Sequence, residues 1–281
     1  GSTLSITSTS LLNSSGKLRA LGMQGDTLIR TGTLDNRLGV LESANSNLKL
    51  EVISLLNADG RIQHVGTGNL DLASSQAMAA GGALVTNGQL SISAQSWVNS
   101  GILQAARLLL NVNQFSQTAS GKLLASESLT ASGSTWDNDG LLASDGTLSL
   151  TLTGAYSGSG TLSSLDDLSL TAGSISLDTN GRVSGGALTT LNSAGTVINR
   201  GRLTSAGDLR ISAGSLNNYG TLGSGENLRL AAANLLNEQG LIFSGENMTL
   251  RANALINDQA DIYSMGTLGI AKDDANGLLN S

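Results

Sequence analysis

The chain contains no cysteine and no proline among its 281 residues, and only seven of them are aromatic. Without cysteine, no disulfide can cross-link the fold and no thiolate is available for chemistry. Proline interrupts the hydrogen-bond ladder of a sheet, so its absence is compatible with strands along the whole chain.

Charge and long apolar runs are scarce as well. Charged residues make up 13% of the chain, and the net charge of −6 is spread along it. Nucleic-acid-binding proteins usually carry concentrated Lys/Arg patches, so we predict no nucleic-acid partner. No apolar run approaches the roughly 18 residues that a membrane-spanning helix needs, and no signal peptide opens the chain. We therefore expect a protein that does not span a membrane.

What the chain has in abundance is repetition. The stretches "SLNNYGTLGSGENLRLAAAN" (215–234) and "LLNEQGLIFSGENMTLRANA" (235–254) share one pattern. A glycine followed two places later by Leu, Ile or Val recurs every 19 to 23 residues, and Ala260 takes this place once more. A fixed period over a whole chain is typical of a solenoid. The repeat glycines are Gly16, Gly39, Gly60, Gly82, Gly101, Gly121, Gly140, Gly160, Gly181, Gly201, Gly220 and Gly240.

Apolar residues around each repeat glycine alternate with a period of two, which predicts short strands. Each glycine is followed two places later by an aliphatic residue and, seven to ten places later in most repeats, by a pair such as Leu228/Leu230. The residue four places before the glycine is also expected in the core; in most repeats it is apolar, and these residues are Leu12, Leu56, Met78, Trp97, Trp136, Tyr156, Leu177, Val197, Leu216, Leu236 and Ile256.

One repeat cannot bury its apolar side alone, but stacked repeats can. The sequence therefore predicts an all-β fold, a right-handed parallel β-helix of about thirteen coils with one coil per ~20 residues. At about 4.8 Å per coil, such a rod would be on the order of 60 Å long.

Asparagine recurs just before the repeat glycines, where stacked amides can form a hydrogen-bonded ladder and tolerate a tight turn. Asn36 and Asn218 also occupy such places. The alternative role for this row of asparagines is a sugar-binding stripe. The repeats of Gly82, Gly121, Gly160 and Gly181 lack this asparagine, so we expect interruptions there. The ladder is assigned to Asn13, Asn57, Asn99, Asn138, Asn199, Asn217, Asn237 and Asn257.

Candidate catalytic groups are few, and we predict no enzyme, no metal and no cofactor. The single histidine, His64, has no second histidine to share a metal or proton relay and is expected to be partly solvated. The adjacent pairs Asp166-Asp167 and Asp273-Asp274 would point to opposite faces of a strand. Asp137 and Asp139 could face the same way, but two carboxylates fall short of a calcium cage.

Trp97 and Trp136 invite a sugar-stacking role. Both stand four places before a repeat glycine, where other repeats carry Leu, Met, Tyr or Val. We therefore predict that both rings belong to the core.

The stretches "SLNNYGTL", "LLNEQGLI" and "VINRGRLT", with "SAGDLRISAGS" and "SGENLRLAAAN", closely resemble the filamentous haemagglutinin repeat. That repeat forms the shafts of very large exoproteins exported by two-partner secretion in Gram-negative bacteria. The chain looks most like the contact-dependent growth inhibition exoproteins, on the basis of "INDQADIYSMGTLGIAKDDANGLLN" (256–280). The resemblance implies a secreted or cell-surface location, an outer-membrane transporter as export partner, and a receptor on a target cell as a further partner.

The chain ends are expected to be those of an excerpt from a longer array. Gly1-Ser2 reads as a cloning scar, and residues 3–281 form a single β-helix domain. The closing "LLNS" repeats the start of "LLNSSGKL" at residues 11–18, so the chain stops where another coil would begin.

Two functions remain open at this stage. The first is a structural shaft that presents a distal receptor-binding region and toxin to neighbouring bacteria. The alternative is an adhesin or glycan-binding module on the β-helix itself, with residues 119–190 as its place because the repeat is least regular there. A polysaccharide-cleaving enzyme would need a carboxylate cluster that the sequence does not contain.

Overall fold

The structure is a computed structural model that describes residues 3–272, without the side chains of residues 79–80. The predicted cloning scar Gly1-Ser2, the Asp273-Asp274 pair and the closing "LLNS" lie outside the described residues. Within the described part all regular elements are strands and all pairings between coils are parallel. The predicted parallel β-solenoid of about thirteen coils with a repeat of ~20 residues is confirmed, whereas its right-handed sense and its length stay predictions.

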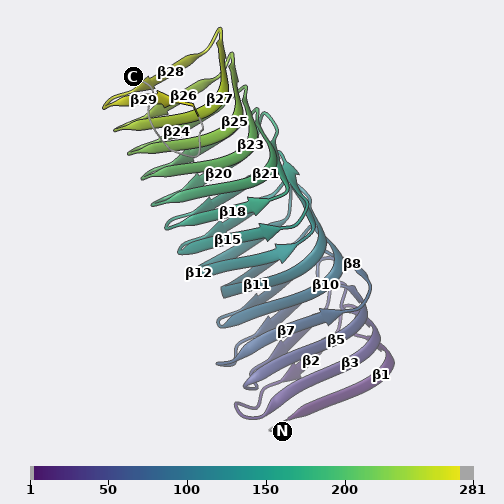
Figure 1. Cartoon of the computed structure of the whole chain (residues 1–281). Coiled ribbons are helices and arrows are strands. Elements are labelled where there is room, and N and C mark those ends of the chain that lie inside the picture. Colours follow the sequence, from purple (N-terminus) through teal and green to yellow (C-terminus); the bar gives the residue numbers. More distant parts are fainter. Residues whose placement is uncertain (1–2, 273–281) are drawn as a thin grey trace. The chain divides into compact units, whose positions relative to one another are not determined.

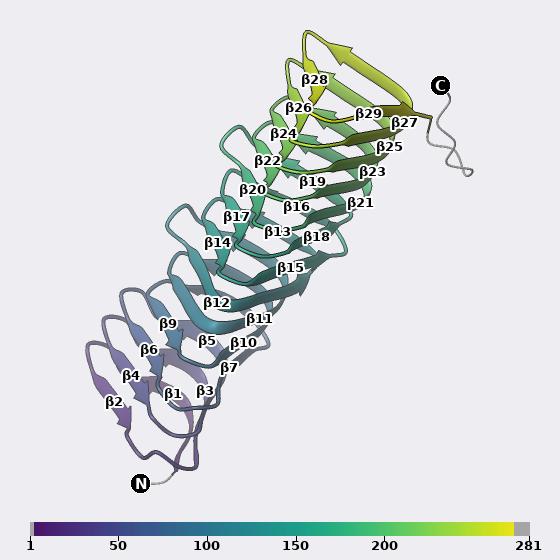
Figure 2. The ribbon, with the colours of Figure 1, turned by 90° about the vertical axis from the view of Figure 1, so that its left-hand side faces the viewer.

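The chain divides into two compact units, the first formed by residues 1–134 and 139–145. In it β1, β3, β5, β7 and β10 lie side by side (Figure 1), as do β2, β4, β6 and β9 (Figure 2). Its strands are β1 (Leu4–Leu12), β2 (Lys17–Ala20), β3 (Asp26–Asp35), β4 (Val40–Ser43), β5 (Asn47–Leu56), β6 (Arg61–His64), β7 (Asn69–Ser74), β8 (Ala77–Ala80), β9 (Ala83–Thr86), β10 (Gln89–Asn99), β11 (Ile102–Gln117), β12 (Lys122–Gly133) and β14 (Leu141–Ser144).

The second unit is formed by residues 135–138 and 146–281. Here β21, β23, β25 and β27 pair in sequence, and so do β22, β24, β26 and β28 (Figure 2). Its strands are β13 (Thr135–Asn138), β15 (Thr147–Leu152), β16 (Ala155–Gly158), β17 (Thr161–Ser164), β18 (Leu168–Ala172), β19 (Ser174–Leu177), β20 (Arg182–Gly185), β21 (Thr189–Asn199), β22 (Arg202–Ser205), β23 (Leu209–Asn218), β24 (Thr221–Ser224), β25 (Leu228–Glu238), β26 (Leu241–Ser244), β27 (Met248–Asp258), β28 (Asp261–Ser264) and β29 (Leu268–Ala271).

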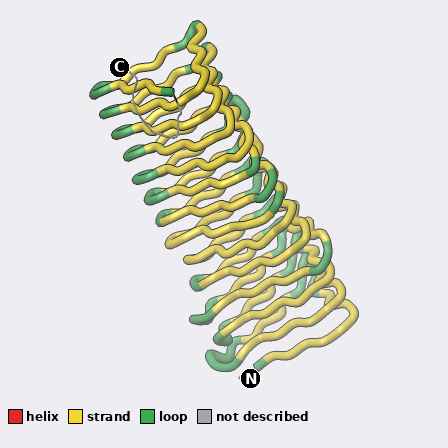
Figure 3. Tube along the Cα trace, viewed as in Figure 1, coloured by secondary structure: helices red, strands yellow, loops and turns green. Residues whose placement is uncertain are grey.

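The alternation seen in the sequence places every second residue of a strand in the core of its unit. Along β25 and its neighbour β23, Leu228 and Leu230 stack on Leu209 and Ile211, and all four are buried. The aliphatic residue two places after each repeat glycine is buried from Leu41 to Ile242. Loops are confined to short corners between strands (Figure 3), so the period of the sequence is the period of the fold.

The prediction that the residue four places before the glycine lies in the core is only partly correct. The two tryptophan rings are buried as expected, and the prediction is correct for Met78, Trp97, Trp136, Tyr156, Leu177, Val197 and Leu216. It is wrong for Leu12, Leu56 and Ile256, which are exposed, and for Leu236, which is half-buried. In those four repeats the preceding residue points inward instead; these residues are Leu11, Leu55, Leu235 and Leu255.

A longer turn causes this shift. Where the asparagine of the hydrogen-bonded row lies three places before the glycine, or before Ala260, an extra residue enters the turn and takes a positive φ, the left-handed region that residues with a side chain rarely adopt. The glycine N–H then bonds back to the asparagine carbonyl, as from Gly39 to Asn36 (3.0 Å). The core residue is thus set by its distance from the asparagine and not from the glycine. The residues at positive φ are Ser15, Leu38, Asp59, Gln239 and Gln259.

Candidate functional site: an asparagine row and the outer faces of the coils

Asparagine side chains form a hydrogen-bonded row inside the first unit. Asn13 Nδ2 donates to Asn36 Oδ1 (2.6 Å), and Asn36 Nδ2 donates to Asn57 Oδ1 (2.7 Å). All three are buried. Farther along, Asn99 Nδ2 donates to Gln117 Oε1 (3.0 Å). Because each amide also donates to backbone carbonyls near its turn, as Asn36 does to Gly39 and Arg61, the row ties neighbouring coils together.

The second unit holds a longer row, and it corrects one assignment. Asn199, Asn218, Asn237 and Asn257 are joined by Nδ2-to-Oδ1 hydrogen bonds of 2.7 Å each. Asn218 belongs to this row and Asn217 does not. Strand alternation explains the difference, since the buried Leu216 and Asn218 flank a half-buried Asn217 that points to the opposite side.

The expected interruptions are also corrected in part. Gln117 fills the asparagine place in the repeat of Gly121, and its Nε2 donates to Leu141 O (2.9 Å), so the row continues there. In the repeat of Gly181, Leu177 stacks on Asn199 and interrupts the row as predicted. Each amide donates toward the next coil, so the interruption leaves Asn199 Oδ1 buried without a partner. Asn138 Nδ2 donates to the Tyr156 hydroxyl (3.2 Å) before that interruption.

The repeat glycines lie at the corner beside the asparagine row. Their carbonyls accept hydrogen bonds from the next coil, for example from Val40 N to Gly16 (2.8 Å) and from Thr221 N to Gly201 (3.0 Å). A Cβ on Gly201 would lie 2.1 Å from Gly181 O. Glycine at this corner therefore permits the close approach of successive coils.

A second inward row, of small polar residues, escaped the sequence analysis. Ser164, Ser224 and Ser244 are buried, and each Oγ donates to a backbone carbonyl two residues later at 2.7–3.0 Å. Each serine stands four places after its repeat glycine, so the same anchor would have found the row. These hydroxyls satisfy carbonyls at another corner of the coil.

His64 lies in this second row, and the expectation that it would be partly solvated is wrong. The side chain is fully buried, stacked between Ser43 and Thr86. Its Nε2 is 3.0 Å from Asn45 O, which can only accept, so Nε2 carries the proton. Nδ1 then accepts from Thr86 Oγ1 (3.0 Å). Both ring nitrogens are used in holding the coil, which makes His64 a structural residue.

The predicted carboxylate candidates are surface groups. Asp166 and Asp167 are exposed at a turn, and Asp167 Oδ1 accepts from Leu188 N (3.1 Å). Asp137 is exposed and accepts from Ser157 Oγ (2.7 Å), and Asp139 is exposed as well. Among residues 3–272, no group of three or more His, Cys, Asp or Glu side chains is placed to hold a metal ion.

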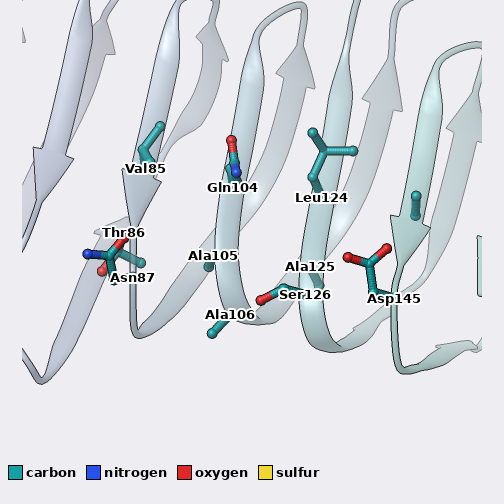
Figure 4. A pocket seen from close by; sticks show the side chains of 11 residues that line it. Val85, Thr86, Asn87, Gln104, Ala105, Ala106, Leu124, Ala125, Ser126 and Asp145 are labelled. Carbon is teal, nitrogen blue, oxygen red and sulfur yellow. The ribbon is translucent and has the colours of Figure 1, made fainter.

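A hollow of about 380 Å³ opens on the outer face of the first unit. Val85, Gln104 and Leu124 stand on neighbouring strands, and Asp145 lies on the next coil, just past the end of β14 (Figure 4). Asp145 is the single carboxylate among the described lining residues. An acid/base pair for glycoside hydrolysis needs two carboxyl groups, so this hollow lacks that machinery.

Three arginines on the outer faces of the first unit each face a carboxylate on an adjacent coil. Arg19 lies 3.0 Å from Glu42, Arg30 lies 2.6 Å from Glu51, and Arg107 lies 2.9 Å from Glu127, each pair joining adjacent coils. The hydrogen bond from Arg30, followed by that from Lys49, lowers the pKa of Glu51 from 4.5 to about 2. The hydrogen bond from Arg37 likewise holds the pKa of Asp35 well below its usual range. Opposite charges that face each other on adjacent strands stabilise a sheet.

The Glu51 pair predicts a defined dependence of stability on pH. A folded-state pKa of about 2 against 4.5 unfolded contributes stability above pH 4.5, and this contribution is lost as the pH falls toward 2. The Arg30→Gln variant should therefore lose less melting temperature between pH 5 and pH 2 than the parent chain. Arg229→Gln, which removes an arginine that forms no ion pair with a carboxylate of residues 3–272, serves as the control and should follow the parent curve. Parallel curves for the parent and Arg30→Gln would contradict the prediction.

The described residues are built of strands and include no helix of the length and apolarity that a membrane crossing requires. No curated protein and no solved structure is significantly similar to the chain. The family model of the haemagglutinin repeat, by contrast, matches residues 1–37, 43–71, 65–133, 107–176, 143–210 and 166–281. These segments cover nearly the whole chain, and the coils that they match carry the asparagine and glycine rows described above. The chain therefore belongs to the haemagglutinin repeat family.

Proposed function

We propose that the chain is a section of the shaft of a large, filamentous, adhesin-like protein that is secreted or held at the cell surface. Its task is to keep a distal binding region away from the producing cell. One observation carries this proposal: within each unit every coil repeats the same backbone contact, from the residue after one repeat glycine to the glycine of the preceding coil. A structure that repeats one contact gains length with each coil, and length is the property that a spacer needs.

The same contacts suggest how the shaft forms. The exposed edge of each coil offers unpaired backbone groups and the open ends of the asparagine and serine rows to the next coil. Folding can then proceed coil by coil as the chain leaves its transporter, with each finished coil acting as the template for the next. The absence of cysteine means that this process requires no disulfide formation.

More specifically, we propose export by two-partner secretion from a Gram-negative cell and a role in contact-dependent growth inhibition. The outer-membrane transporter is then the export partner, and a toxin is carried beyond the shaft. The resemblance of residues 256–280 to exoproteins of this class supports the assignment. A producing strain should inhibit co-cultured neighbours that lack immunity. Adhesion of producing cells without any growth inhibition would instead identify an adhesin.

The chain is further proposed to be without catalytic activity. The single carboxylate in the hollow of the first unit and the structural role of His64 support this. Release of reducing ends from a polysaccharide by the purified chain would contradict it.

The spacer role predicts that length matters and the identity of one coil does not. Thr221 is in register with Leu241, so removing residues 221–240 excises one whole coil and joins Gly220 to Leu241. In the parent exoprotein this deletion should leave secretion and surface display intact. Successive deletions of this kind should reduce delivery to neighbouring cells in proportion to their number.

The control is a deletion that does not remove a whole coil, residues 226–241. It joins Gly225 to Ile242, whereas the residue that follows the equivalent Gly245 is Glu246, so the repeat is shifted by four places. This variant should fail to be displayed. Equal display and delivery for all deletions would overturn the spacer proposal.

A further inference from the structure

Three arginines lie together on the outer face of the second unit, on three consecutive paired strands. Arg210 of β23 is in register with Arg229 of β25, and Arg251 of β27 lies two residues beyond the next position of that row, Thr249. Each alternates with buried aliphatic residues, so all three side chains are on the solvent side of the sheet.

These arginines line a hollow of about 470 Å³. The other outward-facing side chains that line it are small: Thr190, Asn192, Ser212 and Thr249 are polar, and Ala231 is apolar. No carboxylate is among the described lining residues. Arg210 Nη2 lies 3.7 Å from Oδ2 of Asp208, just before the start of β23, which is too long for a hydrogen bond.

This arrangement differs from that of three arginines in the first unit, although Arg182 and Arg202 of the second unit are in register as well. In the first unit, Arg19, Arg30 and Arg107 each face a carboxylate on the next coil. Here Arg210 faces Arg229 on a neighbouring strand, where like charges destabilise a sheet. Because the folded chain gains nothing from this repulsion, the placement of Arg210 beside Arg229 favours a role outside the fold.

We propose that this arginine groove binds an anionic polysaccharide whose sugar units carry carboxylate groups, a role that goes beyond that of a spacer. The planar guanidinium group matches a carboxylate with two parallel hydrogen bonds. Adjacent strands are about 4.8 Å apart, so the three groups span about 10 Å along the coils. A sugar chain with recurring carboxylates can engage all three, whereas a single charged sugar can engage only part of the row.

The remaining lining chemistry distinguishes a saccharide from other polyanions. Threonine, serine and asparagine side chains are suited to the hydroxyl groups of sugars. None of the described lining residues is aromatic, so nucleobases find no stacking platform. The aliphatic residues Ile211 and Leu230 point into the core, so no exposed apolar side chain is available to enter a lipid surface.

The test is binding of oligomeric polygalacturonate to the whole chain, measured by isothermal titration calorimetry at several salt concentrations. The parent chain should bind, and its affinity should fall as salt rises. Arg229→Gln should weaken binding about tenfold, and the triple variant Arg210→Gln, Arg229→Gln and Arg251→Gln about a hundredfold or more. Uncharged dextran should not bind.

A second triple variant provides the matched control. Arg19→Gln, Arg30→Gln and Arg107→Gln change the net charge by the same amount but remove arginines that face carboxylates. This variant should keep the parent affinity within about twofold. If both triple variants lost affinity equally, attraction by net charge would explain the binding and the groove would be ruled out.

The variant Arg229→Glu separates binding from folding. A glutamate opposite Arg210 recreates the paired arrangement of Arg30 and Glu51, so the melting temperature should be kept or raised while polygalacturonate binding is lost. Absence of binding by the folded parent chain would overturn the proposal and leave the spacer role untouched. Binding only to vesicles of anionic phospholipid, and not to polygalacturonate, would overturn it in favour of a lipid ligand.

Discussion

Replacing Gly82 by alanine is expected to lower the free energy of unfolding by about 3 kcal/mol or more. Gly82 has a φ of +71°, a conformation that costs a residue with a Cβ about 1–2 kcal/mol. The new Cβ would also lie 2.1 Å from Asn57 O and 2.3 Å from Gly60 O. Both atoms are backbone atoms of the preceding coil, so neither can rotate away, and such overpacking adds about 1–3 kcal/mol.

The neighbouring Gly81 offers a matched control. A Cβ there would first meet Ser100 Oγ at 3.1 Å, and that hydroxyl can adopt another rotamer. Gly81→Ala should therefore change the free energy of unfolding by no more than about 0.5 kcal/mol. Urea denaturation followed by circular dichroism measures both variants. Similar midpoints for the two would mean that coil spacing is not limited by the repeat glycines.

The fold was predictable because it depends on features that recur. The spacing of the repeat glycines and the alternation of apolar residues predict a strand-built solenoid, and the structure confirms both. Trp97 and Trp136 could be assigned to the core for the same reason, since their place in the repeat is filled by aliphatic residues elsewhere. A period averages over many repeats, so local irregularities do not disturb it.

The errors arose where one repeat differs from the next by a single residue. Counting a fixed number of places back from the glycine assigned Leu56 and Leu236 to the core and Asn217 to the row. Such a count fails because the turn before the glycine differs in length between repeats. A one-residue difference moves a strand residue to the other face. Counting instead from the buried asparagine to the aliphatic residue two places earlier would have placed Leu55, Leu235 and Asn218 correctly.

The environment of single residues was harder to predict. Gln117 continues the row because its side chain is one methylene longer than that of asparagine. Only the structure shows that its amide then reaches both Asn99 and Leu141 O. His64 occupies a position held by serine and threonine in the two neighbouring coils, so its burial follows from stacking and not from its own polarity. The arginine groove was missed because the net charge was judged over the whole chain. Its signal, arginine between two aliphatic residues in "LRI" and "LRL", was present in two successive repeats.

Replacing Asn218 by alanine is expected to lower the free energy of unfolding by about 2–4 kcal/mol. The side chain accepts from Asn199 and donates to Asn237 Oδ1 (2.7 Å) and to Leu241 O (3.2 Å). The three asparagine side chains are buried, and a buried polar group left without its partner costs about 1–3 kcal/mol. Asn199 keeps a second bond, to Thr221 O (2.9 Å), which limits the loss on that side.

Asn217→Ala is the control, one residue away on the same strand. Asn217 is half-buried on the opposite side of β23, so its loss should cost no more than about 0.5 kcal/mol. Amide hydrogen exchange locates the effect: Asn218→Ala should reduce the protection of β23, β25 and β27 and leave that of the first unit unchanged, because a coil in a solenoid acts mainly on its neighbours. Equal destabilisation by the two alanine variants would mean that the amide row contributes no more than an ordinary surface polar group, and the row would then have to be retained for a reason other than stability.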